Sequence, residues 1–159
     1  MSQLHQAIQG GDLEAARTLL EQNPSLVEQR DARGFSPLVF ATYSNQVEIT
    51  RLLLEKGAQV DARDANGNTA LMGIAFKGFT DLAQLLIDAY QADINIRNNS
   101  GATALSFAAM FGQTEMARLL LEKGADATIA DQNGHTPAKY AAMKGFSDLA
   151  ALLEKHEQS

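Results

Sequence analysis

The chain has no cysteine and no tryptophan among its 159 residues, and only 6% of them are aromatic. Without cysteine it forms no disulfide, thiolate nucleophile or cysteine-ligated zinc site, which fits a reducing compartment. Basic residues are also scarce, because 13 Lys and Arg stand against 19 Asp and Glu, for a net charge of −6. A nucleic-acid partner requires a basic stripe along the phosphates, so this composition argues against one.

Long hydrophobic runs are absent as well. No apolar stretch approaches the roughly 20 residues that a membrane-spanning helix requires. The N-terminal segment MSQLHQAIQGGDLEAA lacks the basic and apolar regions of a signal peptide. Hydrophobic residues still make up 45% of the chain and charged residues 20%, a globular composition. We therefore expect one cytoplasmic domain, monomeric, with no membrane and no nucleic-acid partner.

What the sequence does contain is one pattern written four times. The four copies share an outline: GFSPLVFATYSN, GNTALMGIAFKG, GATALSFAAMFG and GHTPAKYAAMKG. Their leading glycines are separated by 33, 34 and 33 residues, which indicates a structural repeat. A worn fifth copy at the N-terminus lacks the leading turn, as expected of a terminal unit. The predicted units span residues 1–30, 31–63, 64–97, 98–130 and 131–159.

Each unit is predicted to form a turn, a helix, a second turn and a second helix. A hydroxyl is placed to cap the first helix, and a carboxylate begins the second helix on the favourable side of its dipole. The capping residues are Ser36, Thr69, Thr103 and Thr136, and the carboxylates are Glu48, Asp81, Glu115 and Asp148. Helices this short are unstable alone. Their apolar faces must pack against the next pair, which predicts an all-α solenoid.

These motifs resemble the ankyrin repeat. DANGNTALMGIA and DQNGHTPAKYAA are similar to its turn and first helix, and EMARLLLEKGADATIAD is similar to its second helix and following hairpin. The resemblance covers nearly the whole chain and implies that the turns form a row of β-hairpins beside the helix stack. It also implies protein binding through the hairpin tips and the concave side of the first helices. The family's first-helix histidine is present only as His5.

Catalytic and metal sites find little support in the sequence. DARDANGNT is rich in calcium-type ligands, but a calcium loop would place Ala62 at its first ligand position and Gly73 at its closing one. The Asp and Asn that begin each loop are better explained as Asx turns. The three histidines lie in different units without metal spacing: His5, His135 and His156. We expect no catalytic residue, no metal and no cofactor.

Residues that differ between the copies are expected to face outward. Near the end of each first helix, aromatic and methionine side chains form an apolar stripe with lysines at its rim, a composition typical of protein interfaces. The predicted partner-binding residues are Phe35, Tyr43, Phe76, Lys77, Met110, Phe111, Met143 and Lys144. Three alternatives stay open: the stripe is exposed for a partner, packs between units, or serves self-association. Phe79 and Phe146 are predicted to be packing residues.

The sequence thus predicts a non-catalytic module that binds another protein, either folded or as an extended segment in the concave groove. One rival is a structural or consensus-like scaffold without a dedicated partner, which the near-identical RLLLEKGA stretches at 51–58 and 118–125 favour. A second rival is a small enzyme or ion-binding protein, which would show a ligand-dependent melting temperature.

Overall fold

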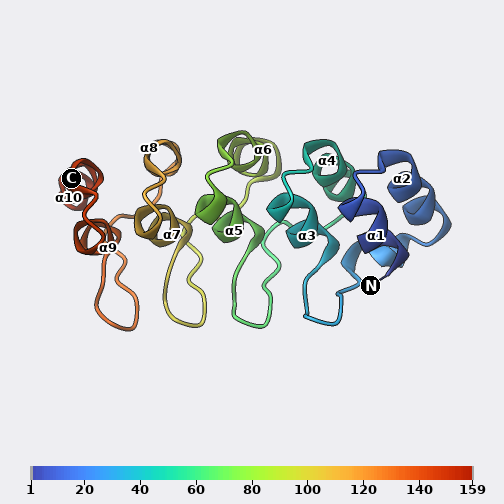
Figure 1. Cartoon of the computed structure of the whole chain (residues 1–159), viewed down its shortest axis with the longest axis horizontal. Helices are drawn as coiled ribbons and strands as arrows, with labels where there is room; N and C mark the ends of the chain where they lie inside the picture. Colours follow the sequence, from blue (N-terminus) through green and yellow to red (C-terminus); the bar gives the residue numbers. More distant parts are fainter. Residues whose placement is uncertain (1, 159) are drawn as a thin grey trace.

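The computed structural model describes residues 2–158, and within them all regular structure is helical. The α-helices lie in two parallel rows along an elongated molecule, with the termini at opposite ends and long loops projecting beyond the first row (Figure 1). The first row consists of α1 (Gln3–Gln9), α3 (Pro37–Tyr43), α5 (Ala70–Lys77), α7 (Ala104–Met110) and α9 (Pro137–Met143). The second row consists of α2 (Leu13–Gln22), α4 (Val47–Glu55), α6 (Thr80–Tyr90), α8 (Thr114–Glu122) and α10 (Ser147–Glu157). The all-α solenoid is confirmed.

The unit boundaries within this solenoid stay a prediction. Met1 and Ser159, the outer ends of the first and last predicted units, lie outside the described residues. One element was not expected from the sequence, a short 3-10 helix at Pro24–Glu28 that follows α2. Proline stands at its first position, where a missing N–H costs no hydrogen bond.

The core between the two rows runs the whole length of the solenoid. At the equivalent position, each second helix carries a leucine that is at most 1% exposed: Leu20, Leu53, Leu86, Leu120 and Leu153. Burying a leucine stabilises the fold by roughly 2 kcal/mol. Buried residues of all five units belong to one continuous cluster, so the stack rather than any single helix pair forms the hydrophobic core.

The predicted helix caps form in three of four full units. The side-chain oxygens of Ser36, Thr103 and Thr136 accept from backbone N–H groups in the first turn of α3, α7 and α9. The prediction was wrong for Thr69, whose side chain makes no capping hydrogen bond. There the N–H of Met72 donates to the carbonyl of Thr69 at 3.2 Å, so the donor that a cap would need is already engaged.

The projecting loops close through their first side chain. In each loop the leading Asp or Asn accepts, through Oδ1, from the backbone N–H groups two and four residues later: Asp31, Asp64, Asn98 and Asp131. The Asx turns are therefore confirmed. The expected row of β-hairpins is not, since residues 2–158 contain no strand. Each loop is a hairpin-shaped turn, which is also closed by a backbone hydrogen bond from the N–H of its leading residue to the carbonyl four residues later.

His5 ties the first loop to the N-terminal unit. Its side chain is fully buried, with Nδ1 2.7 Å from Ser2 Oγ and Nε2 3.2 Å from the carbonyl oxygen of Phe35. The one unit that keeps the family's histidine is therefore joined to the following loop through that side chain. No helix in residues 2–158 has the length and hydropathy needed to cross a bilayer.

Candidate protein-interaction site

The predicted stripe lies along the ends of the first helices, and much of it is accessible. Tyr43, Phe111 and Met143 are 47%, 48% and 60% exposed. Lys77 and Lys144 are exposed too, whereas the remaining predicted residues are half-buried: Phe35, Phe76 and Met110. Packing between units therefore accounts for part of the stripe and leaves the rest at the surface. That these residues bind a partner stays a prediction.

Three of the predicted aromatic residues form a continuous line across neighbouring units. The rings of Tyr43 and Phe76 are nearly parallel with centroids 6.2 Å apart, and Phe76 meets Phe111 edge to face at 4.5 Å. We call Tyr43, Phe76 and Phe111 the aromatic line. Phe76 is half-buried because a ring lies on each side of it, and Met143 extends the apolar surface beyond the last ring.

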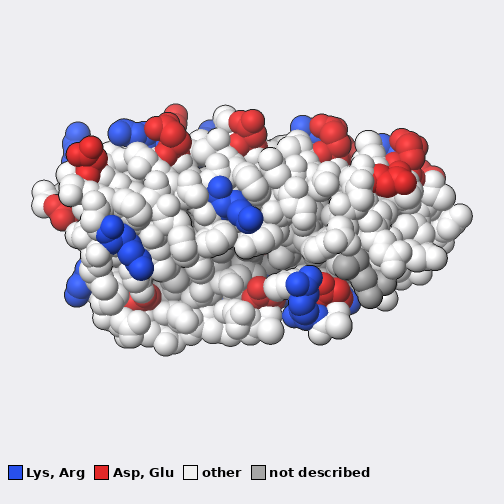
Figure 2. Space-filling model, viewed as in Figure 1, with Lys and Arg blue, Asp and Glu red and all other residues white. Residues whose placement is uncertain are grey.

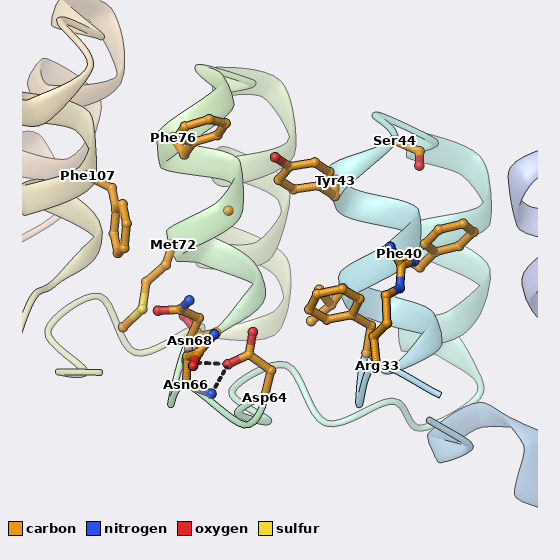
Figure 3. Close-up of a pocket in the computed structure, with 14 residues that line it drawn as sticks. Arg33, Phe40, Tyr43, Ser44, Asp64, Asn66, Asn68, Met72, Phe76 and Phe107 are labelled. Carbon is orange, nitrogen blue, oxygen red and sulfur yellow. Dashed lines mark hydrogen bonds between the residues drawn. The ribbon is translucent and has the colours of Figure 1, made fainter. Parts of the chain in front are cut away.

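A groove of about 450 Å³ opens beside the aromatic line, between α3 and α5. Phe35, Tyr43 and Phe76 line it, as do Phe40, Met72 and Phe107, which the sequence reasoning did not single out. In Figure 3 the ring of Tyr43 extends from α3 toward α5, and Phe107 projects from α7 on the other side of α5. A volume of this size is typical of sites that take several side chains or a small ligand.

The groove has a local cause that is visible in the repeat. Four residues after the capping residue, the first helices carry Phe40, Phe107 and Tyr140, but α5 carries Gly73. A Cβ atom added at Gly73 would lie 3.4 Å from Cδ1 of Tyr43, so the ring of Tyr43 leans over the bare backbone. The missing side chain, rather than any residue present, was the signal that could have located this groove.

Two cations accompany the aromatic rings of the groove. The ammonium of Lys77 lies 4.6 Å from the ring centre of Tyr43, and the guanidinium of Arg33 lies 5.0 Å from that of Phe35. Such cation–π contacts hold the charges against the rings. Arg33 also pairs with Asp31 at 3.3 Å, whereas Lys77 has no carboxylate within ion-pair distance among residues 2–158. Of the two predicted lysines, Lys77 therefore lies against the ring of Tyr43, whereas Lys144 lies at the end of α9 in the last unit.

Charged residues also follow the opposite side of the molecule. Figure 2 shows Lys, Arg, Asp and Glu side chains along the row of second helices, separate basic side chains over the first helices, and a mixed cluster over the projecting loops near α3. On the second helices, three Arg–Glu pairs recur at the same spacing: Glu14–Arg17, Glu48–Arg51 and Glu115–Arg118. Exposed pairs of this kind contribute little stability. The second helices therefore present a charged, solvated face, whereas the aromatic line presents an apolar one.

A second polar cluster closes the last loop. The hydroxyl of Tyr140 donates to Asp131, whose Oδ1 also accepts from the N–H groups of Asn133 and His135. Burial raises the pKa of Asp131, but these hydrogen bonds and the nearby His135 outweigh it and hold that pKa below its ordinary value. Burial and the hydrogen bond to Asp131 raise the pKa of Tyr140 to about 12. The cluster joins the loop to α9 and leaves Asp131 saturated as an acceptor.

Phe79 and Phe146, which follow the turn glycines, differ in their exposure. Phe79 packs against the core, as predicted. Phe146 was also predicted to be a packing residue, and its ring lies against Gly112 of the preceding unit, but the residue remains 37% exposed. His5, His135 and His156 lie apart in the structure, and no three His, Asp or Glu residues within 2–158 are grouped to hold a metal ion.

Comparison with known proteins agrees with the architecture. A family model described as ankyrin repeats (3 copies) matches residues 4–98 and again residues 71–159. The probable E3 ubiquitin-protein ligase XBOS33 of Oryza sativa subsp. japonica is 42% identical over 82 residues, 51% of this chain and 16% of that protein. Protein fem-1 homolog A-like of Mus musculus is 38% identical over 72 residues, 45% of this chain and 11% of that protein.

A third relative, M-phase phosphoprotein 8 of Homo sapiens, is 35% identical over 77 residues, 48% of this chain and 9% of that protein. The chain thus spans no more than 16% of the length of these three relatives. Ankyrin repeats generally mediate protein–protein interaction, and repeat domains of this kind are typically non-catalytic. With both the repeat geometry and a family model that matches residues 4–98 and 71–159, the chain belongs to the ankyrin-repeat family.

Proposed function

We propose that the chain is a non-catalytic module that binds another protein through the aromatic line and the groove beside it. One observation carries the proposal: three aromatic rings follow one another from α3 through α5 to the C-terminal end of α7, and the outer two, Tyr43 and Phe111, are about half exposed. A contiguous exposed apolar surface is unfavourable in water unless something covers it. A few residues supply most of the binding energy in protein interfaces, and tyrosine is enriched among them.

The fold suits this role because the helices that carry the rings are already fixed before a partner binds. The helices beneath the aromatic line are fixed by the leucine core, so a partner meets a preformed surface and loses less entropy on binding. Exposed Lys77 and Lys144 add a positive rim to a protein of net negative charge. The names of the ligase relatives do not extend to this chain, which matches a small part of them.

A pair of matched variants tests the proposal. The first changes the exposed residues of the stripe (Tyr43→Ser, Phe111→Ser and Met143→Ser). The control changes three exposed arginines of the second helices (Arg17→Ser, Arg51→Ser and Arg118→Ser). Proteins captured from the source organism's lysate are identified, and each is then purified and titrated against the wild type and both variants. All three chains must melt at similar temperatures.

We expect at least one purified partner to bind the wild type and the control equally, and the stripe variant at least about tenfold more weakly. A partner that distinguishes the control but not the stripe variant would move the site to the second helices. If no captured protein binds directly once purified, the scaffold alternative is favoured over a binding module.

A further inference from the structure

The groove between α3 and α5 lies where the repeat omits two features that it keeps elsewhere. The first is the ring at the position of Gly73, between Phe40 in the preceding unit and Phe107 in the following one. Both of these rings line the groove, together with Gly73 itself. The space above Gly73 is therefore bounded by the same side chains that would contact an aromatic ring built into α5.

The second omission concerns the bonds between loops. Asn99 donates from its backbone and side chain to the carbonyls of Asn66 and Ala65, and Gln132 does the same to Ser100 and Asn99. The equivalent residue of the second loop is Ala65, which has no side-chain amide to donate. Among residues 2–158 no hydrogen bond joins residues 31–36 to residues 64–69. The groove stays open at the one junction that lacks this bridge.

The charged residues around the groove indicate which charge a ligand should carry. Asp64 lines it, but two backbone N–H groups of its own loop hold Oδ1 of that carboxylate. The charge of Arg33 is shared with Asp31. Lys77 remains as an exposed cation above Tyr43 with no acidic partner in the described chain. A carboxylate brought by a ligand would complete a charge-assisted hydrogen bond there.

We propose that the groove takes an extended segment of a partner protein in which an aromatic side chain is flanked by a carboxylate. This rests on the proposed function and specifies the partner's chemistry. The partner's ring fills the space above Gly73, in contact with Phe40, Met72 and Phe107, and the carboxylate pairs with Lys77. Aromatic rings favour edge and offset contacts with neighbouring rings, which the walls of this groove provide.

Selection from a library of random short peptides tests the proposal without assuming a sequence. The full wild-type chain is the target, and counter-selection uses Gly73→Phe, which restores the ring found in the other units. Because α3 and α7 carry phenylalanine at this position, the variant is compatible with the helix, and its melting curve checks this. We expect the enriched peptides to carry Phe, Tyr or Trp next to Asp or Glu.

The enriched sequence is then synthesised with a single tryptophan as the fluorescent probe, since the chain itself has none. Gly73→Phe should weaken its binding at least about tenfold, whereas Gly73→Ala, which leaves the groove open, should change it less than about threefold. Lys77→Glu should weaken binding and reduce its salt dependence. The equivalent change in the last unit, Lys144→Glu, is the matched control and should have no effect.

Four results would overturn the inference: no enrichment, enrichment of basic or non-aromatic peptides, unchanged binding by Gly73→Phe, or a wild-type dimer that Gly73→Phe converts to monomer. The last would make a second copy of the chain the occupant. The proposed function fails separately. A purified partner that needs Tyr43, Phe111 and Met143 but tolerates Gly73→Phe would support the binding module and reject this segment as its ligand.

Discussion

The first projecting loop, residues 31–36, and the third, residues 98–103, have the same internal hydrogen bonds but very different surroundings. In each, the glycine N–H donates at 2.9 Å to the carbonyl of the leading Asp or Asn. A side chain on Gly101 would come within 3.2 Å of the backbone of the next loop, whereas one on Gly34 would meet nothing within 4 Å. Turns of the same kind are thus in contact with the following loop at Gly101 but not at Gly34.

This difference shows how a repeat protein makes a site without changing its fold. The core extends beneath both junctions, so the fold forms whether or not the loops above it are joined. The groove between α3 and α5 lies where Gly73 replaces the aromatic residue of the other full units and Ala65 replaces the Asn or Gln of the third and fourth loops. Substitutions confined to one loop or junction, compared with substitutions at another loop or junction, measure what each contributes.

The largest effect is expected from the last loop. Asp131→Ala removes the acceptor for two backbone N–H groups and for Tyr140 and leaves them unpaired. We expect a loss of about 2–3 kcal/mol in the free energy of unfolding. Asp31→Ala should cost less, because the first loop has no bond to a helix through its aspartate. Urea unfolding of both variants measures the difference, and equal losses would contradict the role given to Tyr140.

Breaking the bridges between loops should have an intermediate effect. Asn99→Ala together with Gln132→Ala removes two side-chain hydrogen bonds to neighbouring loops, for a loss of about 1–2 kcal/mol. The control is Ala32→Gly with Arg33→Ala in the unbridged first loop, which should cost less. Amide exchange of residues 64–69 should accelerate in the bridge variant. Unchanged exchange would show that the loops are held by packing alone.

A smaller change of opposite sign is expected at Gly73. Because glycine is unfavourable inside a helix, Gly73→Ala should stabilise the chain by about 0.5–1 kcal/mol. The added methyl group meets only the ring of Tyr43, at ordinary contact distance. Thermal unfolding measures the gain. A lower melting temperature would mean that Tyr43 cannot shift and that the groove is more rigid than its open shape indicates.

The smallest effect is expected from acid. The pKa of Asp131 in the folded chain lies below its ordinary value of 3.8. Its ionised form therefore stabilises the fold above that value, and this contribution is lost as the pH falls through the lower folded pKa. Asp131→Asn keeps an acceptor but cannot titrate, so its stability should fall less than that of the wild type between about pH 5 and pH 2. Parallel curves would contradict the lowered pKa.

The sequence predicted the features that depend on residues close together in the chain. Asx turns and hydroxyl caps are set within a few residues, and all but the cap at Thr69 formed. The groove escaped prediction because it follows from what Gly73 and Ala65 lack relative to neighbouring units. The exposure of Phe146 escaped it too, since burial in the last full unit depends on how much of the preceding unit lies beneath the ring.

The most direct test of this account is the hydrogen exchange of two backbone amides, Gly34 and Gly101, in the free protein. Both donate the same hydrogen bond within the same kind of turn, so their difference reports the junction and not the loop. We predict that Gly34 exchanges at least about tenfold faster than Gly101 under native conditions. Equal rates, or a slower rate at Gly34, would contradict an open groove between α3 and α5.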